Sequence, residues 1–260
     1  MTFSIKILTV TLGVILGLGL SVPKSFAFND DEQSEIEAIV HNYLIENPQI
    51  LEEMIAAMKF QEAFSAQKKA KDIIVEKYDA IFYPGAAFVT GNPKGDVTLV
   101  EFFDYTCVFC RKSLPDLEKL INTDPNLRVV FIDFPALRGR NPTSMVATRA
   151  SVAAAQQEGK YAAYHFKMMG TKSGLTEKAI VRIAGEVGLD VEQLTKDMNA
   201  PETYARIDAN MELARDLGID GTPTFIVGDQ VIAGAVGYDL LKAEIDEVRR
   251  KAAAAKTKAD

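Results

Sequence analysis

Residues 97–110 of the chain read VTLVEFFDYTCVFC, and this stretch decides the fold. Val97 to Phe103 is a nearly continuous run of strand formers, which is typical of a strand buried in the middle of a sheet. Two cysteines, Cys107 and Cys110, follow within a few residues and lead into a helical pattern that ends near Asn122. The stretch therefore predicts a buried strand followed directly by a helix, with both cysteines at the junction.

The position of the cysteines points to thiol chemistry. The first turn of a helix offers free N–H groups and a partial positive charge, and both stabilise a thiolate. A cysteine there has its pKa lowered from ~8.5 into the range of ~3.5–7.5. We expect Cys107, at the exposed start of the helix, to be the attacking thiolate. Cys110, one turn further in, is within disulfide-bonding reach and is expected to resolve the mixed disulfide.

Two other functions of a CxxC pair, a zinc site and a structural disulfide, have less support in the sequence. A zinc site needs four ligands, and the chain has no second CxxC; its two histidines, His41 and His165, fall in other predicted elements. A purely structural disulfide over so short a loop would constrain the unfolded chain very little. We therefore expect a redox-active disulfide between Cys107 and Cys110, without a metal or another cofactor.

The rest of the chain predicts an α/β fold. Residues 128–134 read as a second buried strand, and residues 143–217 are almost wholly helical in composition. Two short strands, 224–227 and 230–235, are joined by a Gly-Asp turn, and a last helix starts at Tyr238 and runs to about Lys251. This order predicts a mixed central sheet with helices on both faces and a helical insert. The alanine- and lysine-rich tail is expected to fray.

The first residues have the pattern of a signal peptide. Lys6 precedes an uncharged apolar run from Ile7 to Leu20, and the small residues Ser25 and Ala27 stand at the −3 and −1 positions of a cleavage site. The apolar run is shorter than the roughly 20 residues that a membrane-spanning helix needs. We expect residues 1–27 to be removed on export, where disulfides form and persist.

An N-terminal helical arm, residues 28–84, is expected before the main domain, residues 85–260. Residues 30–47 and about 48–78 have apolar residues at helical spacing, with a break at Asn47-Pro48. The apolar stripe either packs on the main domain or associates with other copies of the chain. Its heptad pattern is imperfect and favours neither alternative.

The charge balance excludes one class of partner. The chain has 29 Lys and Arg against 36 Asp and Glu, a formal net charge of −7, and such a chain is not expected to bind nucleic acid. The two arginines of the ALRGRNP segment, Arg138 and Arg140, are expected to lie on a solvated loop rather than to contact substrate.

A second motif, Gly221-Thr222-Pro223-Thr224, stands just before a predicted strand. From the residues alone, Pro223 is expected to be an ordinary trans proline. However, VEFFDYTCVFC, the helical insert and this late Thr-Pro together resemble the DsbA-like form of the thioredoxin fold over about residues 88–252. The preceding arm makes the chain most similar to the ScsC-like and Com1-like periplasmic thiol oxidoreductases.

The resemblance implies roles for individual residues. It implies that Pro223 is a cis-proline facing the sulfurs and that Thr222 offers its backbone to an extended substrate segment. Val108 and Phe109, which lie between the cysteines, are implied to bind substrate together with Thr222 and Pro223. Glu101 matches a buried acid beneath the dithiol, whose raised pKa would suit proton transfer; the alternative is an exposed carboxylate on an edge strand.

Two departures from DsbA bear on the type of reaction. The dipeptide between the cysteines is Val-Phe rather than Pro-His, and Thr precedes Pro223, as in isomerases of this superfamily. The resemblance thus implies a periplasmic protein disulfide isomerase or reductase, recycled by a membrane redox partner and able to form a homo-oligomer through residues 30–80. The alternatives are a monomeric dithiol oxidase of DsbA type and a copper-tolerance protein that holds Cu(I) on the CxxC pair.

Overall fold

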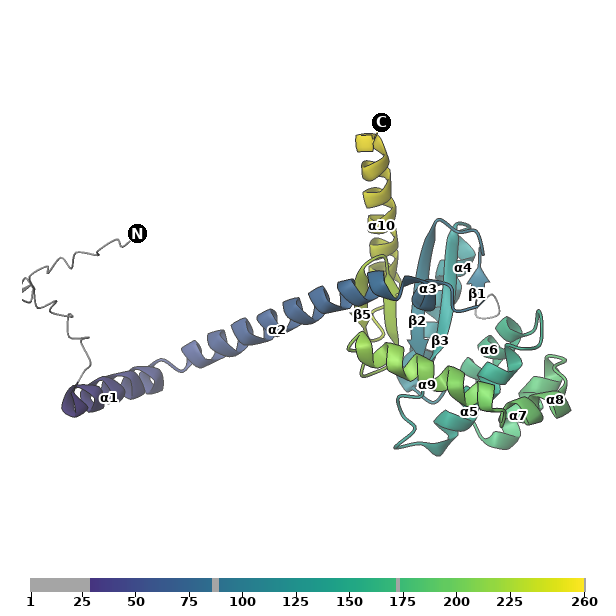
Figure 1. Ribbon diagram of the computed structural model, residues 1–260, viewed down its shortest axis with the longest axis horizontal. Helices are drawn as coiled ribbons and strands as arrows, with labels where there is room; N and C mark the ends of the chain where they lie inside the picture. The colour runs from purple at the N-terminus through teal and green to yellow at the C-terminus, as the bar shows by residue number, and fades with distance from the viewer. Residues whose placement is uncertain (1–28, 86–88, 172–173, 260) are drawn as a thin grey trace, which may run out of the picture. The chain divides into compact units, whose positions relative to one another are not determined.

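Figure 1 shows the computed structural model, which describes residues 29–85, 89–171 and 174–259. The expected signal peptide, residues 1–27, lies outside the described residues. The chain divides into two compact units between Ala57 and Met58. Among the helices of the described ranges, none is both long and apolar enough to cross a membrane.

The described part of the first unit, residues 29–57, is almost wholly helical, as the apolar spacing predicts. Helix α1 spans Asp30–Glu46, and helix α2 spans Gln49–Glu76, so the break at Asn47-Pro48 is confirmed. Asn29 caps α1 through a reciprocal pair of hydrogen bonds with Glu32, which satisfies free N–H groups at the helix start. Helix α1 buries none of its residues.

The second unit holds a mixed five-stranded sheet in the order β1-β3-β2-β4-β5. Strands β2 and β3 are parallel, and every other neighbouring pair is antiparallel. The central position of β2 explains its nearly continuous apolar sequence, because both of its faces and both of its edges are covered. The strands are β1 (Val89–Gly91), β2 (Val97–Phe103), β3 (Leu127–Asp133), β4 (Thr224–Val227) and β5 (Gln230–Ala233).

Helices cover the sheet on both faces, as the element order predicts. Side chains of a strand alternate between faces. Leu99 and Phe103 of β2 share one core with helices α4 (Val108–Thr123) and α10 (Tyr238–Ala259). Val100 and Phe102 point to the other face and pack with the C-terminal part of α2, with α3 and with α9. This other core draws on α3 (Tyr78–Phe82) and α9 (Pro201–Asp216).

The predicted helical insert between β3 and β4 is confirmed. Figure 1 shows its helices gathered beside one end of the sheet. The insert consists of α5 (Pro142–Ala154), α6 (Tyr161–Met169), α7 (Glu177–Glu186), α8 (Val191–Asp197) and α9.

Two elements differ from the sequence predictions. Strand β1 is not predicted from the sequence, because its three residues carry no alternation of their own and form a strand only through antiparallel pairing with β3. Helix α10 continues to Ala259 rather than ending near Lys251, in keeping with the high helix propensity of alanine and lysine.

Candidate active site

The end of β2 and the start of α4 set the position of the two cysteines. Cys107 is the N-cap residue of α4, and its N–H donates to the Asp104 carbonyl oxygen at 3.0 Å. Cys110 lies one turn further along the helix and is buried. The predicted strand–cysteine–helix junction is therefore present.

Asp104 holds this junction together. One of its carboxylate oxygens accepts bonds from the N–H and the hydroxyl of Thr106, both at 2.8 Å. The other accepts from the Leu137 N–H at 2.9 Å and from the Ser144 hydroxyl at 2.7 Å. Asp104 is not predicted as a site residue from the sequence; its signal there is the Asp-x-Thr spacing of an Asx turn.

Cys107 is less exposed than its place at the helix start suggests. Only 6% of the residue is accessible, which corrects the expected exposed position. The reason is the segment before β4: the Cys107 thiol donates to the Thr222 carbonyl oxygen at 3.1 Å. The Thr222–Pro223 peptide bond is cis, in agreement with the resemblance and against the expectation from the residues alone.

Hydrogen bonds favour the thiolate of Cys107. They lower the pKa of Cys107 to about 5, first through the Cys110 thiol and further through the backbone N–H groups of Phe109 and Cys110, while burial opposes the shift. The pKa is thus in the range of reactive cysteines at helix N-termini. At neutral pH, Cys107 carries the negative charge of the site.

Burial disfavours the charged forms of the two groups beneath Cys107. Glu101 is 1% exposed in the centre of β2, so the edge-strand alternative is wrong. Burial raises the pKa of Glu101 well above its ordinary value, and the nearby Cys107 charge raises it further. The pKa of Cys110 is raised by burial first, then by its hydrogen bond to Cys107 and by Glu101. Within the described residues, Glu101 Oε1 has no hydrogen-bond partner.

A hollow of about 480 Å³ opens beside Cys107. The two residues between the cysteines border it and are exposed, Val108 by 73% and Phe109 by 60%. Thr222 closes another side, and Arg140 lies on its wall. Arg140 is exposed, as expected of a solvated loop, but it also borders the hollow that Cys107 lines.

The structure offers no metal centre in the ranges it describes. No group of three or more His, Cys, Asp or Glu side chains lies close enough to share an ion among those residues. His165 is a core residue: it stacks on Phe131, and its Nδ1 lies 3.0 Å from the Tyr105 hydroxyl. Burial lowers the pKa of His165 to about 3, so it stays neutral.

Two parts of the chain match known protein families. Residues 98–246 match the DSBA-like thioredoxin domain, which is more than half of the chain. The chain belongs to the DSBA-like thioredoxin family. Residues 32–63 match the N-terminal domain of the copper resistance protein ScsC.

Solved structures of family members resemble this chain closely. A thioredoxin-like oxidoreductase from Silicibacter pomeroyi is 44% identical, covers 66% of this chain and 97% of its own, and has a TM-score of 0.61. A linker-deletion mutant of Proteus mirabilis ScsC is 27% identical over 86% of this chain and 98% of its own, with a TM-score of 0.63. A periplasmic thioredoxin-like protein from Salmonella enterica serovar Typhimurium is 28% identical over 65% of this chain and 93% of its own, with a TM-score of 0.55.

Several curated relatives, all Na⁺/H⁺ antiporters, are much longer than the region they share with this chain. A Na⁺/H⁺ antiporter NhaA from Herminiimonas arsenicoxydans is 27% identical over 168 residues, which are 64% of this chain but 26% of the antiporter. The chain thus spans about a quarter of that relative.

The thiolate of Cys107 gives a testable pH dependence. In the reduced protein, the rate of Cys107 alkylation by iodoacetamide should rise through a midpoint near pH 5 and stay level above about pH 6. Cys110→Ala removes the largest stabilising hydrogen bond, so its midpoint should move upward by about one pH unit or more. An unchanged midpoint in Cys110→Ala, or a wild-type midpoint near 8, would contradict this account of the thiolate.

Proposed function

We propose that the chain is an exported thiol–disulfide oxidoreductase that acts on protein substrates. The observation that carries the proposal is the pairing of a low-pKa Cys107 with a buried, protonated Cys110 next to Thr222. Membership in the DSBA-like family supports the same chemistry. The cofactor is the cysteine pair itself.

The reaction then proceeds by two exchanges. The Cys107 thiolate attacks one sulfur of a substrate disulfide, forming a mixed disulfide and releasing the other substrate sulfur as a thiolate. Cys110, once deprotonated, attacks Cys107, so that a Cys107–Cys110 disulfide forms and the reduced substrate leaves. The reverse sequence oxidises a substrate dithiol. An isomerase uses the first exchange to form the mixed disulfide. Another thiolate of the substrate, in place of Cys110, then attacks that mixed disulfide and releases Cys107.

Glu101 is proposed to move the proton of Cys110. While Cys107 is a thiolate, its charge helps to keep Glu101 protonated. Once Cys107 is bound in a mixed disulfide, that charge is gone and Glu101 ionises more easily. The resulting carboxylate can accept the Cys110 proton and so create the resolving thiolate.

Substrate contacts are proposed for the residues around the hollow. Thr222 and Pro223 would present their backbone to an extended segment of the substrate, in the manner of a short added strand. The exposed side chains of Val108 and Phe109 would provide apolar contact. None of these contacts needs a side-chain charge.

Within this class we propose an isomerase or reductase rather than a DsbA-type oxidase. Thr222 before Pro223 and the absence of an imidazole between the cysteines both support this direction. An isomerase also benefits from several active sites in one assembly, and the helical arm, residues 28–84, would provide the assembly surface ahead of the catalytic domain, residues 85–260.

The surface of the arm supports self-association. Helix α1 buries nothing, and large apolar side chains on α1 and the first half of α2 are exposed. A stripe of this kind is unusual on a solvated helix and is typical of helices that pair with copies of themselves. We propose a homo-oligomer formed through residues 30–80. The exposed apolar residues include Ile36, Ile39, Val40, Tyr43, Leu44, Leu51, Met54, Ile55 and Met58.

Export to the periplasm, with cleavage near Ala27, completes the proposal. The signal pattern of residues 1–27 and the likeness to a periplasmic thioredoxin-like protein support it. In that compartment a membrane redox partner would return the cysteine pair to its working state.

Copper binding is a second candidate. The match of residues 32–63 to a domain of a copper resistance protein favours it, and two adjacent thiols can hold Cu(I). Titration of the reduced protein with Cu(I), beside the redox assay below, separates the two functions.

Replacing the attacking thiol tests the redox proposal. Cys107→Ser should abolish insulin reduction and the reactivation of scrambled ribonuclease, a loss of at least about a thousandfold, because no other cysteine can form the first mixed disulfide. A Cys107→Ser protein that keeps wild-type activity in both assays would overturn the proposal. A wild type that oxidises reduced ribonuclease but never reshuffles the disulfides of the scrambled enzyme would instead favour the oxidase.

Charges placed on the arm test the oligomer. The double variant Ile39→Glu and Leu51→Glu changes two residues that are each 61% exposed, so the fold of the single chain should not suffer. Light scattering should report a multiple of the chain mass for the mature protein and a single chain mass for the variant. Leu240→Glu, at a 43% exposed apolar site outside residues 30–80, is the matched control and should remain oligomeric. A monomeric wild type would contradict the proposal.

A further inference from the structure

A second cavity lies next to the hollow that holds Cys107. Its volume is about 600 Å³, within the range of ~300–1,000 Å³ that is usual for ligand pockets. Asp220 borders both this cavity and the Cys107 hollow. The two spaces therefore adjoin along the segment that leads into Thr222.

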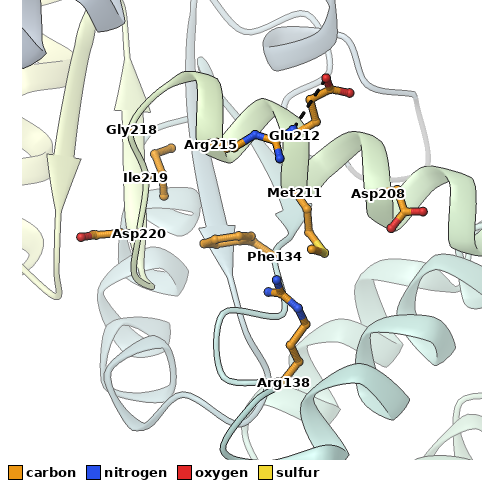
Figure 2. Close-up of a pocket in the computed structure, with 9 residues that line it drawn as sticks. All are labelled: Phe134, Arg138, Asp208, Met211, Glu212, Arg215, Gly218, Ile219 and Asp220. Atoms are coloured by element: carbon orange, nitrogen blue, oxygen red, sulfur yellow. Dashed lines mark ion pairs between the residues drawn. The ribbon is translucent and has the colours of Figure 1, made fainter.

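The floor of the cavity is apolar. Phe134, just after β3, and Ile219, just after α9, are almost fully buried, and Met211 of α9 is half-buried against them. Figure 2 shows the Phe134 ring and the Met211 side chain close together at the centre of the cavity. An apolar side chain entering here would lose contact with water and gain contact with carbon and sulfur.

The rim carries charges of both signs. Arg215 pairs with Glu212 at 3.7 Å, and Arg138 donates to the Pro135 carbonyl oxygen at 3.2 Å. Figure 2 shows the two arginines on opposite sides of the floor. Because acids and arginines are mixed around the opening, neither a positive nor a negative ligand is favoured. The apolar floor therefore determines which ligands bind. The charged residues are Arg138, Asp208, Glu212, Arg215 and Asp220.

The position of the cavity along the chain indicates its occupant. Residues 218–220 border the cavity, and Thr222, two residues further on, accepts the hydrogen bond of the Cys107 thiol. A substrate segment that pairs with Thr222 and is linked to Cys107 would therefore continue over Asp220 towards Ile219. At about 3.3 Å per extended residue, two or three residues cover that stretch.

We propose that this cavity, floored by Phe134, Met211 and Ile219, is a specificity subsite for a large apolar side chain of the substrate. The inference rests on the proposed thiol–disulfide exchange and adds the residue preference of the substrate. With antiparallel pairing, the arrangement that β4 has with both of its neighbours, the apolar residue lies two or three positions after the substrate cysteine.

Peptides of matched sequence test the subsite. Each peptide carries one cysteine as a mixed disulfide with thionitrobenzoate, and a single leucine stands either after or before the cysteine in a serine and glycine background. The Cys107 thiolate attacks the peptide sulfur, the bond to the aromatic sulfur breaks, and thionitrobenzoate leaves with the electron pair. The release of thionitrobenzoate gives the second-order rate constant.

The wild type should react about tenfold faster when leucine stands two or three residues after the cysteine than when it stands before it. Met211→Glu should remove this advantage, since the floor then carries a charge. Met211→Leu and Ala205→Glu, the latter at an exposed site of the same helix, should keep it. Equal rates for the two peptides in the wild type, a preference for leucine before the cysteine, or an unchanged advantage in Met211→Glu would overturn the subsite.

The aromatic disulfide without a peptide is the internal control. It is too small to span from Cys107 to the cavity, so all variants should react with it at the wild-type rate, which also shows that they are folded. Failure of the wild type in this control would count against the proposed function itself rather than against the subsite.

Discussion

Three acidic groups, Cys107, Cys110 and Glu101, lie in the buried region where the central strand β2 leads into α4, and burial disfavours more than one negative charge among them. Desolvation raises the pKa of Glu101 and of Cys110, whereas hydrogen bonds from Cys110 and from the start of α4 lower the pKa of Cys107. A second negative charge in the same apolar surroundings would cost several kcal/mol. The charge therefore resides on the sulfur that meets the substrate.

The fold keeps these groups away from water by covering the site on all sides except the hollow beside Cys107. Strand β2 has neighbours on both edges and a core on each face, which keeps Glu101 away from water. Asp104 ties the turn before Cys107 to Leu137 and to Ser144 of the insert, so that strand, helix and insert meet at one carboxylate. The segment that ends at Thr222 closes the last side. Substrate access is left to the hollow beside Cys107 and the adjoining cavity.

Much of this arrangement can be predicted from the sequence, because its strongest signals are local. The apolar run 97–103 and the Gly-Asp turn before Gln230 define their strands without help from distant contacts. The position of Cys107 at a helix start follows from the order of the same residues. The cis peptide bond before Pro223 is predicted only through the family resemblance, because the residues alone favour a trans bond.

The remaining features depend on contacts between distant segments, which a sequence pattern does not contain. Strand β1 exists only through pairing with β3, and the partners of Asp104 lie 33 and 40 residues away. The burial of Cys107 depends on Thr222, 115 residues later. The apolar cavity brings Phe134 together with Met211 and Ile219, from opposite ends of the insert.

The central claim, that the site holds a single negative charge, is tested most directly by the titration of Glu101. Carbon NMR of the reduced protein with labelled glutamate should show the pKa of Glu101 well above that of an ordinary glutamate in the wild type. In Cys107→Ser the sulfur charge is absent, and the pKa of Glu101 should be lower than in the wild type, although burial still keeps it above the ordinary value. An ordinary glutamate pKa for this carboxyl in the reduced wild type, or identical titration in the two proteins, would contradict the account.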